Sequence, residues 1–138
     1  MVAVPPDRIP VTANEARWLS SIAALDRVGT GGKVGARIAY ESFLKRWPEN
    51  IAAAIGLANA HYALGELGAA EAVLRGAARR APDSVVVLNN LAQTLSDQGR
   101  DEEALPLIER AAAAGGPFSA AVQQTRQTVL DRISAKKK

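Results

Sequence analysis

Length, composition and charge narrow the kinds of protein that this chain can be. Its 138 residues suit one domain with a modest core, and the absence of cysteine excludes disulfides, thiolate metal sites and a cysteine nucleophile within it. The net charge is +3, and Lys136, Lys137 and Lys138 end the chain, so the rest is almost neutral and predicts no nucleic-acid partner. Alanine is abundant and aromatic residues are scarce, which favours close-packed helices, and no apolar run is long enough to predict membrane insertion.

Residues 1–13 are predicted to be a linker rather than part of a folded domain. The opening "MVAVPPDRIP" has neither the basic region nor the apolar stretch of a signal peptide. The prolines that follow "VAV" are typical of a stiff connection. We therefore expect an upstream domain and expect the chain to be a piece of a longer protein.

Residues 14–134 are predicted to form one domain of repeated helix pairs. Residues that recur at a spacing of 34 include Pro48 and Pro82, Gly65 and Gly99, Leu57 and Leu91, and Ala58 and Ala92. The run "VVVL" at 85–88 by itself suggests a β-strand, but it is in register with "IAAA" at 51–54, which begins a helical pattern. Asn50 and Ser84 precede these stretches and are good N-caps, so both stretches are predicted to be first helical turns.

The residues at fixed places within each repeat resemble the tetratricopeptide repeat (TPR) family. Repeat 51–84 carries the family pattern as Ala54, Leu57, Ala58, His61, Gly65, Ala70, Leu74, Ala77 and Pro82. Repeat 85–118 carries it as Leu88, Leu91, Ala92, Leu95, Gly99, Ala104, Ile108 and Ala111, with Gly116 where the family has proline. The resemblance implies an all-α fold, a right-handed superhelix or α-solenoid of about three helix-turn-helix repeats.

The two ends of the domain fit the pattern less closely. Repeat 15–48 matches in its second half, and its first half matches if "GTGGK" at 29–33 is a turn that is one residue longer. Residues 118–134 are predicted to be a capping helix that covers the open end of the solenoid. Its inward stripe is Val122, Thr125, Val129 and Ile133. Residues 135–138 are predicted to be a disordered basic tail.

The sequence predicts no catalytic residue, no metal site and no cofactor. His61 is the only histidine and lacks a nucleophile partner, so we expect it to pack between helices. The acids Glu66, Glu71, Asp101, Glu102 and Glu103 fall at turns or helix starts, where carboxylates are typical of capping. "GTGGK" lacks the spacing and the preceding strand of a phosphate loop.

The resemblance implies a concave groove that binds a partner protein. The candidate binding residues are Asn59 and Tyr62 in the second repeat, Asn89, Asn90 and Gln93 in the third, and Arg27 in the first. Amide side chains suit the main chain of an extended peptide, and Tyr62 suits packing on a side chain. For Asn90 the alternative interpretation is a common family residue with no binding role.

Asn59 and Asn90 also match the two asparagines of TPR domains that clamp a terminal carboxylate. That clamp has basic residues where this chain has Ile55, Ala120 and Gln124. Capture of a terminal carboxylate is therefore not expected.

The predicted function is a protein-interaction module that presents its groove to a peptide or helix of a partner. The alternative is homo-oligomerisation, through Trp18 or Val129 at the solenoid ends. The segment 5–29 with two good repeats and a "GG" ending is similar to the C-terminal TPR segment of bacterial proteins that carry an N-terminal bacteriocin-processing-type cysteine peptidase domain. That resemblance implies an accessory domain in the cell envelope or periplasm; without it we expect a cytoplasmic protein.

Overall fold

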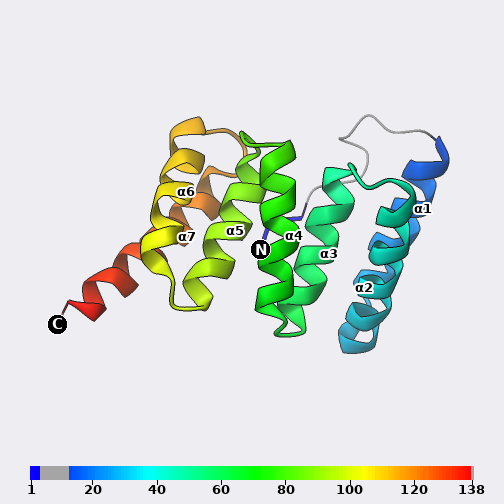
Figure 1. Ribbon diagram of the computed structural model, residues 1–138, viewed down its shortest axis with the longest axis horizontal. Coiled ribbons are helices and arrows are strands. Elements are labelled where there is room, and N and C mark those ends of the chain that lie inside the picture. The colour runs from blue at the N-terminus through cyan, green and yellow to red at the C-terminus, as the bar shows by residue number, and fades with distance from the viewer. Residues whose placement is uncertain (4–12, 138) are drawn as a thin grey trace. The chain divides into compact units, whose positions relative to one another are not determined.

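The protein, shown in Figure 1 as a computed structural model, is described over residues 1–3 and 13–137. Over these residues the chain forms α-helices and no strand. The helices are α1 (Ala13–Asp26), α2 (Gly29–Arg46), α3 (Ile51–Ala63), α4 (Leu67–Arg80), α5 (Val85–Asp97), α6 (Asp101–Ala114) and α7 (Ser119–Lys136). The predicted all-α helical-repeat fold is confirmed. Most of the predicted linker, residues 4–12, lies outside the described residues.

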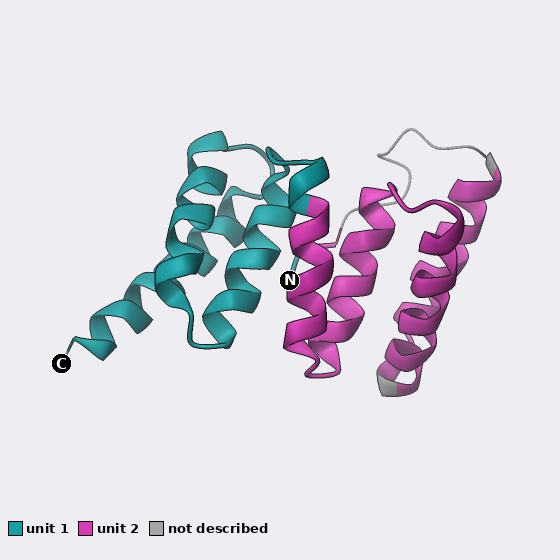
Figure 2. Ribbon diagram, viewed as in Figure 1, with its two compact units in different colours: residues 1–2, 78–138 teal, residues 3–77 magenta. Residues whose placement is uncertain are grey.

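The chain divides into two compact units, which Figure 2 distinguishes by colour. The N-terminal unit comprises residues 3–77, in which α1, α2 and α3 pack on one another. The C-terminal unit comprises residues 78–138 together with residues 1–2, and in it α5, α6 and α7 pack on one another. The first two residues of the chain thus belong with helices far along the sequence.

The N-caps of α3 and α5 show that the valine-rich run at 85–88 begins a helix. The Asn50 side chain accepts a hydrogen bond from the Ala53 N–H at 2.9 Å, and the Ser84 hydroxyl accepts one from the Val87 N–H at 3.3 Å. Each cap satisfies one of the backbone donors that the first helical turn leaves unpaired. "VVVL" is therefore the first turn of α5, as predicted.

The turns after α3 and α5 are built alike. Gly65 and Gly99 have φ of 78° and 81°, a region that only glycine adopts readily. Next to them, the Glu66 N–H donates to the His61 carbonyl at 2.8 Å and the Arg100 N–H donates to the Leu95 carbonyl at 3.0 Å. This wider bond beyond a left-handed residue closes the helix end in the Schellman manner.

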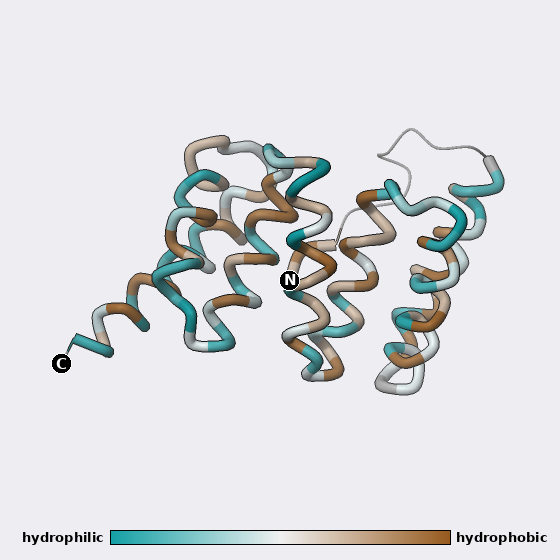
Figure 3. Tube along the Cα trace, viewed as in Figure 1, coloured by the Kyte–Doolittle hydropathy of each residue, from teal (hydrophilic) through white to brown (hydrophobic). Residues whose placement is uncertain are grey.

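The cores of both units lie along the apolar stripes of their helices, which appear as brown bands in Figure 3. In the N-terminal unit the cluster includes Leu19, Ile22, Ala36, Tyr40, Phe43, Ala52, Ala53 and Leu57. In the C-terminal unit the buried side chains include Leu91, Leu95, Ile108, Val122 and Val129. Small residues such as Ala36 and Ala104 are fully buried, which lets neighbouring helices approach closely.

Two predicted boundaries differ from the structure. "GTGGK" was predicted to be a turn, but α2 begins at Gly29 and includes it. The reason is a close approach to α1: a Cβ on Gly32 would lie 2.5 Å from the Leu25 carbonyl oxygen, so glycine permits a helix here. At the other end α7 continues to Lys136, past the predicted end at 134, because Lys136 bonds to the turn before α6.

One of the two residues predicted to mediate self-association is buried in the structure. Val129 is fully buried within the C-terminal unit, so it does not offer a surface for the predicted alternative of a homodimer. Trp18 of α1 remains 41% exposed. Within the described part of the chain, none of the helices has the length and apolarity that a membrane crossing requires.

Candidate functional site

The candidate site is a pair of asparagines on α5. Asn89 and Asn90 are adjacent in sequence and are 2% and 0% exposed. The Asn89 Nδ2 donates to the Asn90 Oδ1 at 3.2 Å, so the two carboxamides are linked. Buried amides are costly unless they are hydrogen-bonded, which makes this pair unusual on a helix whose other buried residues are mostly apolar.

Residues Met1 and Val2 lie against this pair. The Val2 N–H donates to the Asn90 Oδ1 at 3.0 Å, and the Asn90 Nδ2 donates to the Val2 carbonyl at 2.9 Å. One side chain thus pairs with both main-chain groups of one residue. A carboxamide presents a donor and an acceptor side by side, as a peptide group does, so it can bond an extended segment without regard to that segment's side chains.

Thr94, one helical turn after Asn90, completes the surface that we call the Asn90 seat: Asn89, Asn90 and Thr94. The Thr94 hydroxyl donates to the Asn90 carbonyl at 2.7 Å and lies 3.7 Å from the Met1 Sδ. Thr94 is fully buried. Sequence analysis missed its place in the site, although its spacing of four from Asn90 puts both on one helical face.

The Asn89 Oδ1 is buried and has no hydrogen-bond partner among the described residues. An unpaired buried acceptor costs about 1–3 kcal/mol. The Asn90 seat therefore contains one acceptor that Met1 and Val2 do not satisfy.

The other predicted binding residues are placed as follows. Gln93 lies on α5 and is half-buried. In the N-terminal unit, Asn59 and Tyr62 lie on α3 and are half-buried, while Arg27 is exposed in the turn between α1 and α2. Of the six predicted residues, the structure shows Asn89 and Asn90 bonded to each other.

His61, which the sequence predicts to pack between helices, also takes part in an ion-pair group. Its Nδ1 lies 3.1 Å from the Glu66 Oε1, and the Arg37 Nη1 donates to the same carboxylate at 3.2 Å. The hydrogen bond with His61, and then that with Arg37, holds the pKa of Glu66 below its usual range. No nucleophile lies in this group, which is a helix-turn contact within the N-terminal unit.

A second polar cluster joins α7 to the end of α5 and the start of α6. The Ser96 hydroxyl donates to the buried Asp101 carboxylate, and the Lys136 Nζ lies 2.9 Å from the Asp101 Oδ2. Arg132 donates to both Ser96 and Asp97 at 2.8 Å. Burial by itself raises the pKa of Asp101, but the hydrogen bonds from Ser96 and Lys136 outweigh it and hold that pKa below its usual range. The cluster explains why α7 remains helical to Lys136.

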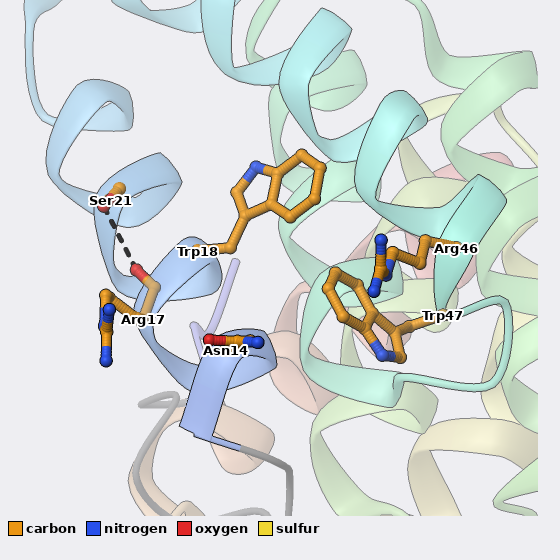
Figure 4. A pocket seen from close by; sticks show the side chains of 6 residues that line it. All are labelled: Asn14, Arg17, Trp18, Ser21, Arg46 and Trp47. Carbon is orange, nitrogen blue, oxygen red and sulfur yellow. Dashed lines mark hydrogen bonds between the residues drawn. The ribbon is translucent and has the colours of Figure 1, made fainter.

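A shallow hollow at the start of the N-terminal unit is lined by tryptophan and arginine (Figure 4). The Trp18 and Trp47 rings meet edge-on with centroids 5.4 Å apart, and Arg46 lies over the Trp47 ring at 5.0 Å. Arg17 lines the same hollow. Among residues 1–3 and 13–137 no group of histidine or carboxylate side chains is arranged to hold a metal ion.

Comparison with protein families agrees with the helix pairs. A family model for the tetratricopeptide repeat matches residues 35–86, and a second model of the same description matches residues 85–114. The two matches together run over more than half of the chain, from within α2 to the end of α6. A comparison with curated proteins finds no match. The chain belongs to the tetratricopeptide repeat family, whose repeats generally mediate interactions between proteins.

Proposed function

We propose that this chain is a protein-interaction module whose Asn90 seat binds an extended segment of a partner protein. The observation that carries the proposal is the pair of hydrogen bonds, 3.0 Å and 2.9 Å, between the Asn90 carboxamide and the main chain of one residue. These bonds support a ligand that is bound by its backbone, a polypeptide in extended form.

The seat favours binding over a merely structural role because Asn90 is held in place before a partner arrives. The Asn89 Nδ2 donates to the Asn90 Oδ1 at 3.2 Å, which orients the Asn90 carboxamide. A fixed side chain loses little freedom on binding, so more of each hydrogen bond contributes to affinity. The unsatisfied Asn89 Oδ1 supplies a further acceptor for a partner's N–H.

The proposed ligand is not a terminal carboxylate. Ile55, where the carboxylate-clamp resemblance requires a lysine, is an apolar residue that is only 1% exposed. Amides that bond a main chain have no need of a terminus. The proposed activity is therefore capture of an internal extended segment, with no catalysis by this chain.

A selection from a random peptide library displayed on phage tests the proposal. Selected peptides should bind the wild-type chain and lose roughly tenfold or more in affinity for Asn90→Ala, because about two hydrogen bonds are removed. Gln123→Glu on α7, where Gln123 is exposed, is the matched surface control and should bind as wild type. Circular dichroism of each variant establishes that it is folded. Peptides that bind Asn90→Ala as tightly as wild type would refute the role of the seat.

Self-association through Trp18 is a second candidate function. The observation in its favour is an exposed tryptophan beside Trp47 and two arginines in the hollow of Figure 4. Aromatic and arginine side chains are enriched at interfaces. Light scattering over a hundredfold range of concentration should show dimers that Trp18→Ala abolishes; a monomer throughout would exclude this candidate.

We also propose that the chain is an accessory domain of a larger bacterial protein, with a cysteine peptidase domain upstream. The support is the similarity of segment 5–29 to the linker and first helix of such proteins. In that setting the Asn90 seat would hold an extended segment of a peptidase substrate. Sequencing the gene upstream of this segment decides the point, since a reading frame without a catalytic cysteine domain would overturn it.

A further inference from the structure

We propose that the chain carries its own ligand: Met1–Val2 is an intramolecular occupant of the Asn90 seat, which a partner segment must displace. The inference rests on the proposed function, because it identifies what fills the proposed binding surface when no partner is present. Met1 and Val2 belong to the same compact unit as α5, although Val2 and Asn90 are 88 residues apart in sequence. Residues 1–3 lie in neither a helix nor a strand.

The contact has the properties of a bound ligand rather than of a segment that merely lies on the surface. Val2 uses both its N–H and its carbonyl, and both bonds go to one side chain, at 3.0 Å and 2.9 Å. The Met1 side chain lies on the same helix, with its sulfur 3.7 Å from the Thr94 hydroxyl. Methionine is flexible and fills irregular surfaces well, so the occupant is a flexible apolar residue followed by a residue read by its backbone.

The same contact is suited to exchange. Because both of these Asn90 bonds go to main-chain atoms of Val2, any extended segment offers the same two groups. Met1–Val2 leaves the Asn89 Oδ1 unsatisfied, so a competitor that adds one N–H there gains an interaction that the internal segment lacks. A partner's apparent affinity is then lowered by the fraction of time for which Met1–Val2 fills the seat.

Two variants at one position separate the backbone contact from side-chain packing. Val2→Pro removes the N–H that Asn90 accepts, whereas Val2→Ala keeps both main-chain groups and only shortens the side chain. Both changes are made in the full chain, with the presence of Met1 verified by mass spectrometry.

The first measurement is the NMR signal of the Asn90 side-chain amide. We expect Val2→Pro to shift this signal and Val2→Ala to leave it close to wild type. An Asn90 signal that is the same in all three chains would overturn the inference. That result would leave the proposed function to be judged by the peptide selection, so the two can fail separately.

The second measurement is binding of the labelled peptide acetyl-MVAVPPDRI-amide, followed by fluorescence anisotropy. Loss of about one hydrogen bond by the internal segment corresponds to a gain of roughly threefold to tenfold in affinity for Val2→Pro over wild type. Val2→Ala should bind as wild type, and Asn90→Ala should bind poorly in either background. Equal affinity for wild type and Val2→Pro would mean that the seat is open and would overturn the inference.

Dilution identifies which copy supplies the occupant. A segment of the same chain gives an Asn90 signal that does not change with protein concentration, which supports the proposal. A signal that moves toward that of Val2→Pro on dilution would mean that Met1–Val2 comes from a second copy, which would overturn the intramolecular form.

Discussion

Gly56→Ala gives a sharp test of the packing between α2 and α3. A Cβ on Gly56 would stand 2.7 Å from both Cε1 and Oη of Tyr40, and closer still to its Cζ. Carbon atoms in contact normally lie about 3.5–4.0 Å apart, so the ring or the helix must move by about 1 Å. Tyr40 has little room to do so: it is 5% exposed, it belongs to the core cluster, and burial, with a smaller effect of Asp26, raises its pKa to about 12.

The expected cost follows from two opposing effects. Overpacking a core costs typically 1–3 kcal/mol, and the distances at Gly56 place this substitution near about 3 kcal/mol. Alanine in place of glycine within a helix returns about 1 kcal/mol. We expect a net loss of about 2 kcal/mol in the free energy of unfolding, or a Tm lower by roughly 6–10 °C. Urea unfolding followed by far-UV circular dichroism measures it.

Gly68→Ala is the matched control for this prediction. Gly68 is exposed near the start of α4, and nothing lies within 4 Å of a Cβ built there, so we expect a gain of about 0.5–1 kcal/mol. In a Tyr40→Leu background the ring is absent, and Gly56→Ala should cost much less than in wild type. If Gly56→Ala were as stable as Gly68→Ala, or cost the same with and without the ring, the clash argument would be wrong.

Two further substitutions test the polar contacts of the C-terminal unit. Asp101→Asn removes a carboxylate bonded by Ser96 and Lys136, and we expect about 1.5–3 kcal/mol lower stability at pH 7. Folding lowers the pKa of Asp101 from 3.8, so its carboxylate stabilises the fold above that pH, and this stabilisation is lost as the pH falls below it. In urea unfolding between pH 5 and pH 2, the free energy of unfolding of the variant should therefore fall less steeply than that of wild type. An equally steep fall would refute this role of Asp101. Ser84→Ala should cost about 1 kcal/mol in thermal unfolding through the lost cap on Val87, with Ser84→Gly costing only a few tenths; no loss with alanine would contradict the capping assignment.

The repeated part of the fold could be predicted from sequence because its causes are local. A spacing of 34 between Gly65 and Gly99 fixes the turns, and Asn50 and Ser84 fix the helix starts by bonds that reach only three residues. The prediction that residues 29–33 form a turn was wrong, because glycines usually end helices. At Gly32 the missing side chain instead permits close approach to the end of α1, which depends on three-dimensional packing.

The candidate site was only partly predictable for a related reason. Asn89 and Asn90 were found from their position in the repeat, and the structure brings their side chains together. The contact with Val2 joins residues 88 apart and follows no periodicity, so no pattern in the sequence indicates it. The same holds for Lys136 and Asp101, whose pairing depends on how the end of α7 lies against the start of α6.

The twin turns at Gly65 and Gly99 bear on how such a chain folds and changes in length. Each turn closes through bonds between residues no more than five apart, His61 to Glu66 and Leu95 to Arg100, so each helix hairpin is complete without a distant strand or loop. Contacts of short sequence separation cost little loop entropy to form and are associated with rapid folding. A helix hairpin with such a turn can also be duplicated or deleted as a unit. The number of repeats then changes, while the bonds within every remaining turn stay the same.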